Sequence, residues 1–165
     1  MQSLNLFNWI KQNEGQMVPP VGNKVIWPDR DFIVMIIKGP NNRKDFHING
    51  GEEFFYQLKG NMVLKTYVDN KFRNVEIKEG EIFLLPPNTP HSPQRPKDSI
   101  GMVIEKRRGA NEIDSFAWYC DNCMSKLYQE DFHLTDIASQ FPPIFKRFYA
   151  SGFNKCKNCG FELIE

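Results

Sequence analysis

The sequence predicts a mainly β protein in which antiparallel strands close into one barrel or sandwich, with a short helix before them and a helical segment after them. Three observations support this. Short apolar or alternating runs follow one another between residues 24 and 119, as is typical of strands. Gly, Pro and Asn recur between these runs and supply the dihedral angles of tight turns. The chain has 165 residues, which suits one domain with one core.

A short opening helix is expected from about Leu4 to Gln12, because Trp9 and Ile10 lie on one helical face together with a leucine. Ser3 or Asn5 can cap its first turn. We expect this helix to cover the end of a sheet.

Eight strands are expected to follow, and strands this close together must pair with one another in a meandering or Greek-key unit. Their expected ranges are Lys24–Trp27, Phe32–Lys38, Glu53–Leu58, Met62–Val68, Arg73–Ile77, Ile82–Leu85, Ser99–Glu105 and Ser115–Tyr119. The turns expected between them are Gly39–Asn42, Asn49–Gly51, Lys59–Asn61, Asp69–Asn70 and Pro86–Asn88.

The sequence pattern changes after residue 119. A helical stretch from about Thr135 to Tyr149 contains Pro142 and Pro143, and proline is tolerated where a helix begins. We therefore expect a helix that begins near Pro143 and turns Phe148 inward. The expected organisation is a barrel with the candidate functional site over residues 1–119 and an appendage over residues 120–165, packed on the same domain.

The four cysteines occur as two C-x-x-C pairs, Cys120 with Cys123 and Cys156 with Cys159. Two disulfides are one interpretation, but the paired spacing favours a single tetrahedral thiolate site in a reducing compartment. Such a site accepts iron or zinc, and the sequence does not choose between them. Its distance along the chain from the other motifs predicts a structural role, since metal binding contributes folding free energy.

Charge and hydropathy exclude several classes of function. With 21 basic and 20 acidic residues the formal net charge is +1, so no overall field attracts nucleic acid or an anionic membrane. The first ten residues lack the features of a secretory signal, and no apolar run reaches transmembrane length. We expect a cytoplasmic protein with neither nucleic-acid nor membrane partners.

The chain has only three histidines, and two of them, His47 and His91, combine with Glu53 at the spacing of a two-histidine, one-carboxylate iron site. These ligands hold ferrous iron on one face and leave the opposite positions open, which suits oxygen activation. A single histidine is more often packed or hydrogen-bonded than a ligand, so the prediction depends on the three residues together. Glu52 is a competing ligand, but alternation sends Glu52 and Glu53 to opposite faces of a strand.

Two motifs carry a resemblance to the cupin superfamily. The segment His47–Glu53, followed by a strand and Gly60, resembles the first cupin motif with Asn49 in place of its second histidine. The residue count in this motif selects Glu53 over Glu52. The replacement converts a three-histidine site into a histidine, glutamate, histidine triad.

The second motif begins at Gly80, reaches Pro86 after five residues, and continues through Asn88 to His91. It resembles the second cupin motif with asparagine where glycine is usual. Asparagine tolerates positive φ better than most residues, so the departure is mild.

Three further segments, Gly39–His47, Leu85–Arg95 and Val103–Glu105, resemble the 3-hydroxyanthranilate 3,4-dioxygenase family. Bacterial and fungal members of that family also end in paired cysteines. The resemblance covers nearly the whole chain, and the order and spacing of the motifs make the combination specific.

The resemblance implies a cupin fold, that is, a double-stranded β-helix or jelly-roll barrel, with catalytic Fe2+ held by His47, Glu53 and His91. It implies an oxidoreductase of the kynurenine pathway that converts 3-hydroxyanthranilate and O2 to 2-amino-3-carboxymuconate semialdehyde. That product closes to quinolinate without an enzyme, on a route to NAD biosynthesis. The family also tends to form homodimers.

The resemblance further implies that Arg43 and Arg95 bind the substrate carboxylate and that Glu105 binds the substrate and handles its proton. A guanidinium group pairs with a carboxylate through two parallel hydrogen bonds, which suits this role. Alternatively, the arginines are solvated loop charges and Glu105 forms a surface ion pair with the basic residues that follow it.

Two other functions remain open at this point. A different cupin metalloenzyme could act on another carboxylated aromatic substrate, since a fold does not determine chemistry. A non-catalytic metal-binding regulator, with the cysteine pairs as a nucleic-acid-binding knuckle, is disfavoured by the near-neutral charge.

Overall fold

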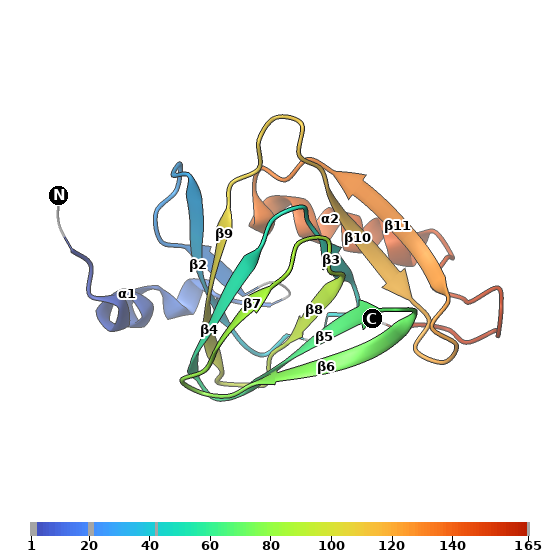
Figure 1. Cartoon of the computed structure of the whole chain (residues 1–165), viewed down its shortest axis with the longest axis horizontal. Coiled ribbons are helices and arrows are strands. Elements are labelled where there is room, and N and C mark those ends of the chain that lie inside the picture. The colour runs from blue at the N-terminus through green and yellow to red at the C-terminus, as the bar shows by residue number, and fades with distance from the viewer. Residues whose placement is uncertain (1–2, 20–21, 42, 165) are drawn as a thin grey trace.

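The computed structural model describes residues 3–19, 22–41 and 43–164 and contains two antiparallel β-sheets flanked by helices (Figure 1). Asn42, the last residue of the expected turn Gly39–Asn42, lies outside the described residues. So do the first two residues of the expected barrel segment and the last residue of the expected appendage. The helices are α1 (Leu6–Asn13), the 3-10 turn η1 (Glu14–Gln16) and α2 (Ile137–Ala150). The strands are β1 (Asn23–Val25), β2 (Phe32–Lys38), β3 (Phe46–Ile48), β4 (Glu53–Lys59), β5 (Met62–Val68), β6 (Lys71–Ile77), β7 (Ile82–Leu85), β8 (His91–Gln94), β9 (Ile100–Lys106), β10 (Asp114–Tyr119) and β11 (Lys126–Phe132).

The strand order shows how the barrel closes. One sheet runs β1-β2-β9-β4-β7 and the other β11-β10-β3-β8-β5-β6. Strands far apart in the chain lie side by side, such as β2 with β9 and β3 with β10. Inward positions alternate along the strands: Phe55 of β4 and Leu64 of β5 are at most 1% exposed. The predicted mainly β architecture is therefore confirmed.

Several turns have the conformations that their residues favour. Asp69 and Asn70, between β5 and β6, both have positive φ (53° and 58°), which suits a two-residue hairpin. Gly60, after β4, has φ 63°, and Asn88 has φ 59°. The asparagine in the second motif thus adopts the left-handed conformation for which glycine is usual.

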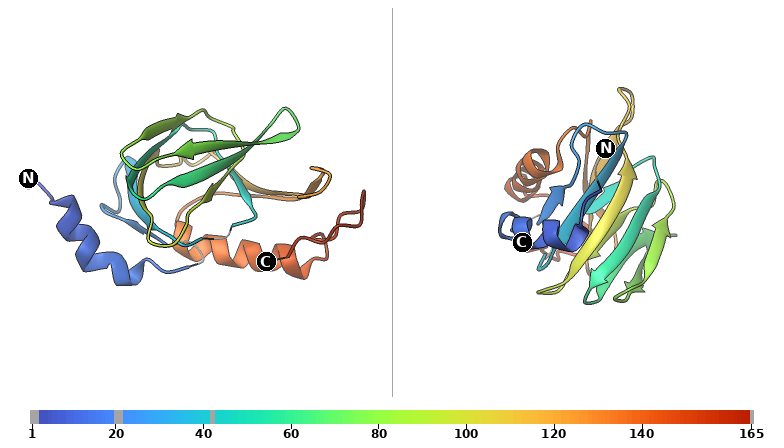
Figure 2. Two further views of the ribbon diagram at one scale, coloured as in Figure 1. Left: turned by 90° about the horizontal axis from the view of Figure 1, so that it is seen from below. Right: turned by 90° about the vertical axis from the view of Figure 1, so that its left-hand side faces the viewer.

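Helix α1 begins after Asn5, whose side-chain oxygen accepts a hydrogen bond from the backbone of Asn8 at 3.0 Å. Its buried residue Ile10 packs with Ile36 of β2, which faces away from the barrel interior. The expected short helix is confirmed, and it covers the outer face of the five-stranded sheet rather than its end (Figure 2).

Helix α2 begins at Ile137, not near Pro143 as expected. Asp136 caps it by accepting a hydrogen bond from the backbone of Ser139 at 2.7 Å. Both prolines lie inside the helix, where each removes a backbone donor. Packing offsets this loss, because Phe141 and Phe148 are buried in the same core cluster as the barrel residues.

Three strands were not among those expected. Strands β3 and β8 have three and four residues, too few to show periodicity, and β8 contains Pro93. Strand β11 is a polar edge strand with no run of buried residues. Across the described residues, no helix is both long enough and apolar enough to cross a membrane.

We predict that Phe148→Ala lowers the free energy of unfolding by about 3–5 kcal/mol, because it leaves a cavity in the core. Phe148 is fully buried and stacks on Trp118 of β10 with ring centroids 4.4 Å apart. The measurement is urea unfolding followed by both tryptophan fluorescence and circular dichroism.

The control is Phe7→Ala, where the side chain is 71% exposed and a change within about 0.5 kcal/mol is expected. If Phe148→Ala released the helix while the strands unfolded at the wild-type denaturant concentration, α2 and the barrel would not share one cooperative core.

Candidate metal and substrate site

The candidate metal site joins the two sheets. His47 of β3 pairs directly with His91 of β8 in the strand register, and Glu53 is the first residue of β4 in the other sheet. Glu53 Oε1 lies 3.5 Å from His47 Nδ1 and 3.3 Å from His91 Nε2. One ligand atom from each residue lies within 4.8 Å of the others, and all three residues are buried. Two imidazole nitrogens and a carboxylate oxygen arranged in this way fit a divalent transition metal.

The electrostatics of this cluster favour cation binding. Burial alone would raise the pKa of Glu53, but the neighbouring His91 and His47 hold that pKa well below its ordinary value. Burial opposes the charged form of His47, yet hydrogen bonds to Asp114 and Glu53 raise its pKa to about 9. The cluster therefore keeps an anionic carboxylate beside a positive charge, and a bound cation can take the place of the imidazole proton.

Asn49, which replaces the second histidine of the first motif, orients the carboxylates. Its side-chain nitrogen donates to Glu53 Oε1 and, at 3.5 Å, to Glu105 Oε2, while its oxygen accepts from the backbone of Gly51 at 3.1 Å. Glu52 is exposed whereas Glu53 is 4% exposed, as strand alternation requires.

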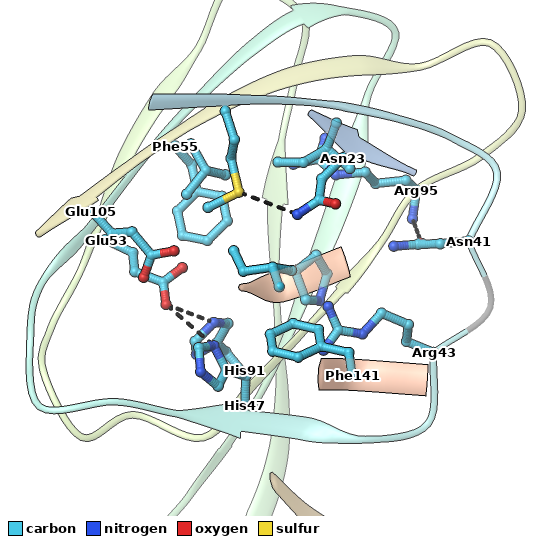
Figure 3. A pocket seen from close by; sticks show the side chains of 15 residues that line it. Asn23, Asn41, Arg43, His47, Glu53, Phe55, His91, Arg95, Glu105 and Phe141 are labelled. Atoms are coloured by element: carbon cyan, nitrogen blue, oxygen red, sulfur yellow. Dashed lines mark hydrogen bonds and ion pairs between the residues drawn. The ribbon is translucent and has the colours of Figure 1, made fainter. Parts of the chain in front are cut away.

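A pocket opens beside the three residues and encloses about 490 Å³ not filled by atoms, part of it open to solvent (Figure 3). Its charged lining includes Arg43, Arg95 and Glu105, so the structure brings all the predicted site residues of the barrel together. Its apolar wall is formed by Met35, Ile37, Phe55, Val103, Ile137 and Phe141.

Arg95 is 3% exposed and has no carboxylate partner among the residues that the structure describes. Its Nη1 donates to Gln57 Oε1 at 3.0 Å, and its buried Nε has no hydrogen-bond partner in the described part of the chain. Burial and the nearby Arg43 lower its pKa to about 10. A buried guanidinium with an unmet hydrogen-bonding group destabilises the folded protein unless a ligand supplies the missing partner.

Gly101 of β9 makes room for this guanidinium. It lies opposite Gln57 in the strand register, and a Cβ atom built on it would overlap the Arg95 side chain. A side chain at position 101 would therefore displace the Arg95 guanidinium from its present position.

Arg43 extends into the same pocket but is already paired. Its Nε donates to Asp45 Oδ1 at 3.1 Å, and its Nη2 forms an ion pair with the other oxygen of Asp45. Its guanidinium carbon lies 5.4–5.7 Å from the ring centroids of Phe116, Phe141 and Phe145, within cation–π range. Arg43 is thus held by aromatic rings and one carboxylate, rather than solvated in a turn.

Glu105 lies at the inner end of β9, directly opposite Glu53 in the register, and is 3% exposed. Burial and the charge of Glu53 raise its pKa to about 7, although Arg108 and His47 act in the opposite direction. Its ion pair with Arg108, at 2.6 Å, is buried, so the alternative of a surface ion pair is wrong.

Sequence reasoning missed four residues that the structure places at or behind this pocket. Asp114 Oδ2 lies 2.7 Å from His47 Nε2, and Arg108 contacts Asp114. Ile137 and Phe141, from the segment expected to be an appendage, form part of the wall. No motif marks these positions: Asp114 begins β10, Arg108 lies in the segment between β9 and β10, and Ile137 and Phe141 belong to α2.

The four cysteines gather at a second site, between the β10–β11 turn and the segment after α2. The Sγ atoms of Cys120 and Cys159 lie 3.5 Å apart, and those of Cys123 and Cys156 lie 3.6 Å apart. These separations exceed a disulfide bond of about 2.05 Å. They approach the edge of roughly 3.8 Å expected for a tetrahedron with metal–sulfur bonds of about 2.3 Å. The arrangement fits one tetrahedral metal.

Comparisons with known proteins agree with this geometry. Residues 1–149 match the family model described as 3-hydroxyanthranilic acid dioxygenase. The chain is 49% identical to the 3-hydroxyanthranilate 3,4-dioxygenase of Xanthomonas euvesicatoria pv. vesicatoria, over 95% of this chain and 89% of that protein. It is 47% identical to the protein of the same name from Paraburkholderia phytofirmans, over 94% of this chain and 91% of that protein.

Solved structures support the fold. A cupin-2 domain protein from Shewanella frigidimarina superposes with a TM-score of 0.51 at 18% identity, over 63% of this chain and 94% of that chain. The predicted cupin fold is therefore confirmed. The match of the family model and the identity to curated relatives show that this chain belongs to the 3-hydroxyanthranilic acid dioxygenase family.

Proposed function

We propose that this chain is a ring-opening dioxygenase that converts 3-hydroxyanthranilate and O2 to 2-amino-3-carboxymuconate semialdehyde, with both oxygen atoms retained in the product. One observation carries the substrate assignment: the buried guanidinium of Arg95, which has no carboxylate partner among the described residues, lines the pocket beside His47, Glu53 and His91. A carboxylate on the ligand would pair with the guanidinium of Arg95 while the ring of the ligand reaches the metal site.

In this proposal His47, Glu53 and His91 hold Fe2+, which supplies open coordination positions and the redox chemistry that oxygen activation requires. The choice of Fe2+ follows from the donor set, since two imidazoles and one carboxylate are typical of non-haem iron oxygenases.

The remaining residues bind and orient the substrate. Arg95 and Arg43 contact its carboxylate, and the aromatic residues around Arg43 limit how far that side chain can turn. Glu105, with a pKa of about 7, accepts the proton of the ring hydroxyl at neutral pH. The apolar wall that includes Phe55 and Phe141 reduces the access of water.

The cysteine site, in the same proposal, holds a second Fe or Zn that stabilises residues 120–165 on the barrel. Four thiolates around one ion leave no open position, so the site is structural.

We further propose a homodimer. The outer face of the five-stranded sheet carries an apolar row across β7, β4, β9 and β2, which includes the half-exposed Leu84. Helix α1 covers only the neighbouring part of that face.

The function is tested by loading the protein with Fe2+ without oxygen and then adding 3-hydroxyanthranilate and air. We expect the absorbance of the muconate semialdehyde to rise in proportion to the iron bound. Protein in which Glu53→Gln removes the anionic ligand is the control and is expected to lose both iron and turnover. Full iron at the three residues with no consumption of 3-hydroxyanthranilate would contradict the proposal.

The two arginines are predicted to contribute unequally. Arg95→Ala should raise KM for 3-hydroxyanthranilate by at least about 100-fold, because it removes a charged hydrogen-bond partner from a buried site. Arg43→Ala should have a smaller effect, because Asp45 already neutralises Arg43. The control is Arg73→Ala, since the Arg73 side chain is 58% exposed and pairs with the surface carboxylate of Asp69. Unchanged KM in both pocket variants would remove the arginines from substrate binding.

For the second site, Cys156→Ser is predicted to lose one metal equivalent and to increase hydrogen exchange in residues 120–125 and 153–163. Ring cleavage should remain largely intact when the first site is full of iron, because the cysteine site does not line the pocket. Metal analysis, exchange mass spectrometry and turnover measure these effects. Loss of turnover at full iron occupancy would show that the second site takes part in the reaction.

A further inference from the structure

His47 uses both ring nitrogens, and the second one contacts a residue that the proposed function does not employ. Nδ1 faces Glu53, whereas Nε2 donates a hydrogen bond to Asp114 Oδ2 at 2.7 Å. Asp114 is the first residue of β10 and is 1% exposed. A carboxylate that accepts this hydrogen bond keeps the proton on Nε2 and leaves the Nδ1 lone pair for a metal.

Asp114 is itself held by Arg108, which follows β9. Arg108 Nε donates to Asp114 Oδ1 and Nη2 to Oδ2, both at 2.7 Å, so the pair is bidentate. The third nitrogen of the guanidinium, Nη1, lies 2.6 Å from Glu105 Oε2. The Arg108 side chain is 5% exposed although it belongs to a connecting loop. One buried cation therefore joins the carboxylate behind His47 to the carboxylate that faces the substrate pocket.

We propose that Asp114 and Arg108 are positioning residues that orient His47 toward the metal and Glu105 toward the substrate, and that couple the two. The inference rests on the proposed metal site and assigns roles to two residues outside the three ligands and the predicted pocket residues. Asp114 sets the ring orientation and tautomer of His47. Arg108 fixes Asp114 and Glu105 relative to each other.

A bare structural role is the alternative. The same contacts could simply satisfy buried charges and anchor residues 107–113, whose turn is also closed by a hydrogen bond from the backbone of Glu112 to Gly109 at 3.0 Å. Such a role would affect stability without changing the affinity or the geometry of the metal site. The test therefore needs a readout at the metal.

The first experiment compares wild type with Asp114→Asn at a series of buffered Fe2+ concentrations under anaerobic conditions. Iron at the triad is counted by electron paramagnetic resonance of its nitric oxide adduct, which forms only where a coordination position is open. We expect Asp114→Asn to weaken iron binding about 10- to 100-fold and to alter the rhombicity of the signal. The control is Asp131→Asn, an exposed carboxylate of β11 that bonds Ser115, which should match wild type.

The second experiment uses Arg108→Lys, which keeps the charge but cannot contact two carboxylates through a planar fork. At saturating iron we expect kcat to fall about tenfold or more with little change in KM, since Glu105 loses its fixed orientation while Arg95 still binds the substrate. This variant also decides the matter if Asp114→Asn does not fold.

The outcomes separate the two proposals. Wild-type iron affinity and an unchanged spectrum in Asp114→Asn, or wild-type kcat in Arg108→Lys, would overturn the positioning role. A wild-type protein that binds no iron at the triad, or that leaves 3-hydroxyanthranilate uncleaved when loaded, would instead overturn the proposed function.

Discussion

The structure depends on the burial of charged groups inside a barrel whose walls are otherwise apolar. Glu53, Glu105 and Asp114 are each at most 4% exposed, and an unpaired charge in such a place is strongly destabilising. Arg108 compensates two of these carboxylates, and the two imidazoles compensate the third. Because these charges are paired, the two sheets can pack their apolar side chains around a polar centre. The proposed function follows from the same constraint: Arg95 has no carboxylate partner among the described residues, and a carboxylate on the proposed substrate would balance its charge.

Much of the fold could be predicted from the sequence, because its information is local. Most strands show alternating burial, and turns such as Asp69–Asn70 contain residues that favour positive φ. The strands β3 and β8 were harder, since three or four residues carry no period and their pairing is a long-range property. The predicted start of α2 was wrong for another reason. Its prolines disfavour helix locally, but tertiary packing of Phe141 and Phe148 outweighs that preference.

The candidate site likewise contains residues that could be predicted from the sequence and residues that could not. His47, Glu53 and His91 could be predicted because two motifs with regular spacing bring them into register across the sheets. Arg108 and Asp114 could not, because nothing in the local sequence distinguishes Arg108, whose side chain is 5% exposed, from the half-buried Arg107 and the exposed Lys106 beside it. Their importance arises from geometry alone, where one guanidinium reaches two carboxylates. Residues that act by orienting another residue lie outside the motifs, so the spacing of the motifs does not reveal them.

The place of α2 has a consequence for how the molecule can be divided. The first turns of this helix supply Ile137 and Phe141 to the pocket wall, and the chain beyond its other end carries Cys156 and Cys159. A fragment cut after β10 would keep His47, Glu53 and His91 yet expose the pocket on one side. The catalytic unit is therefore larger than the barrel that bears its motifs, and the terminal segment belongs to the enzyme's interior as much as to its surface.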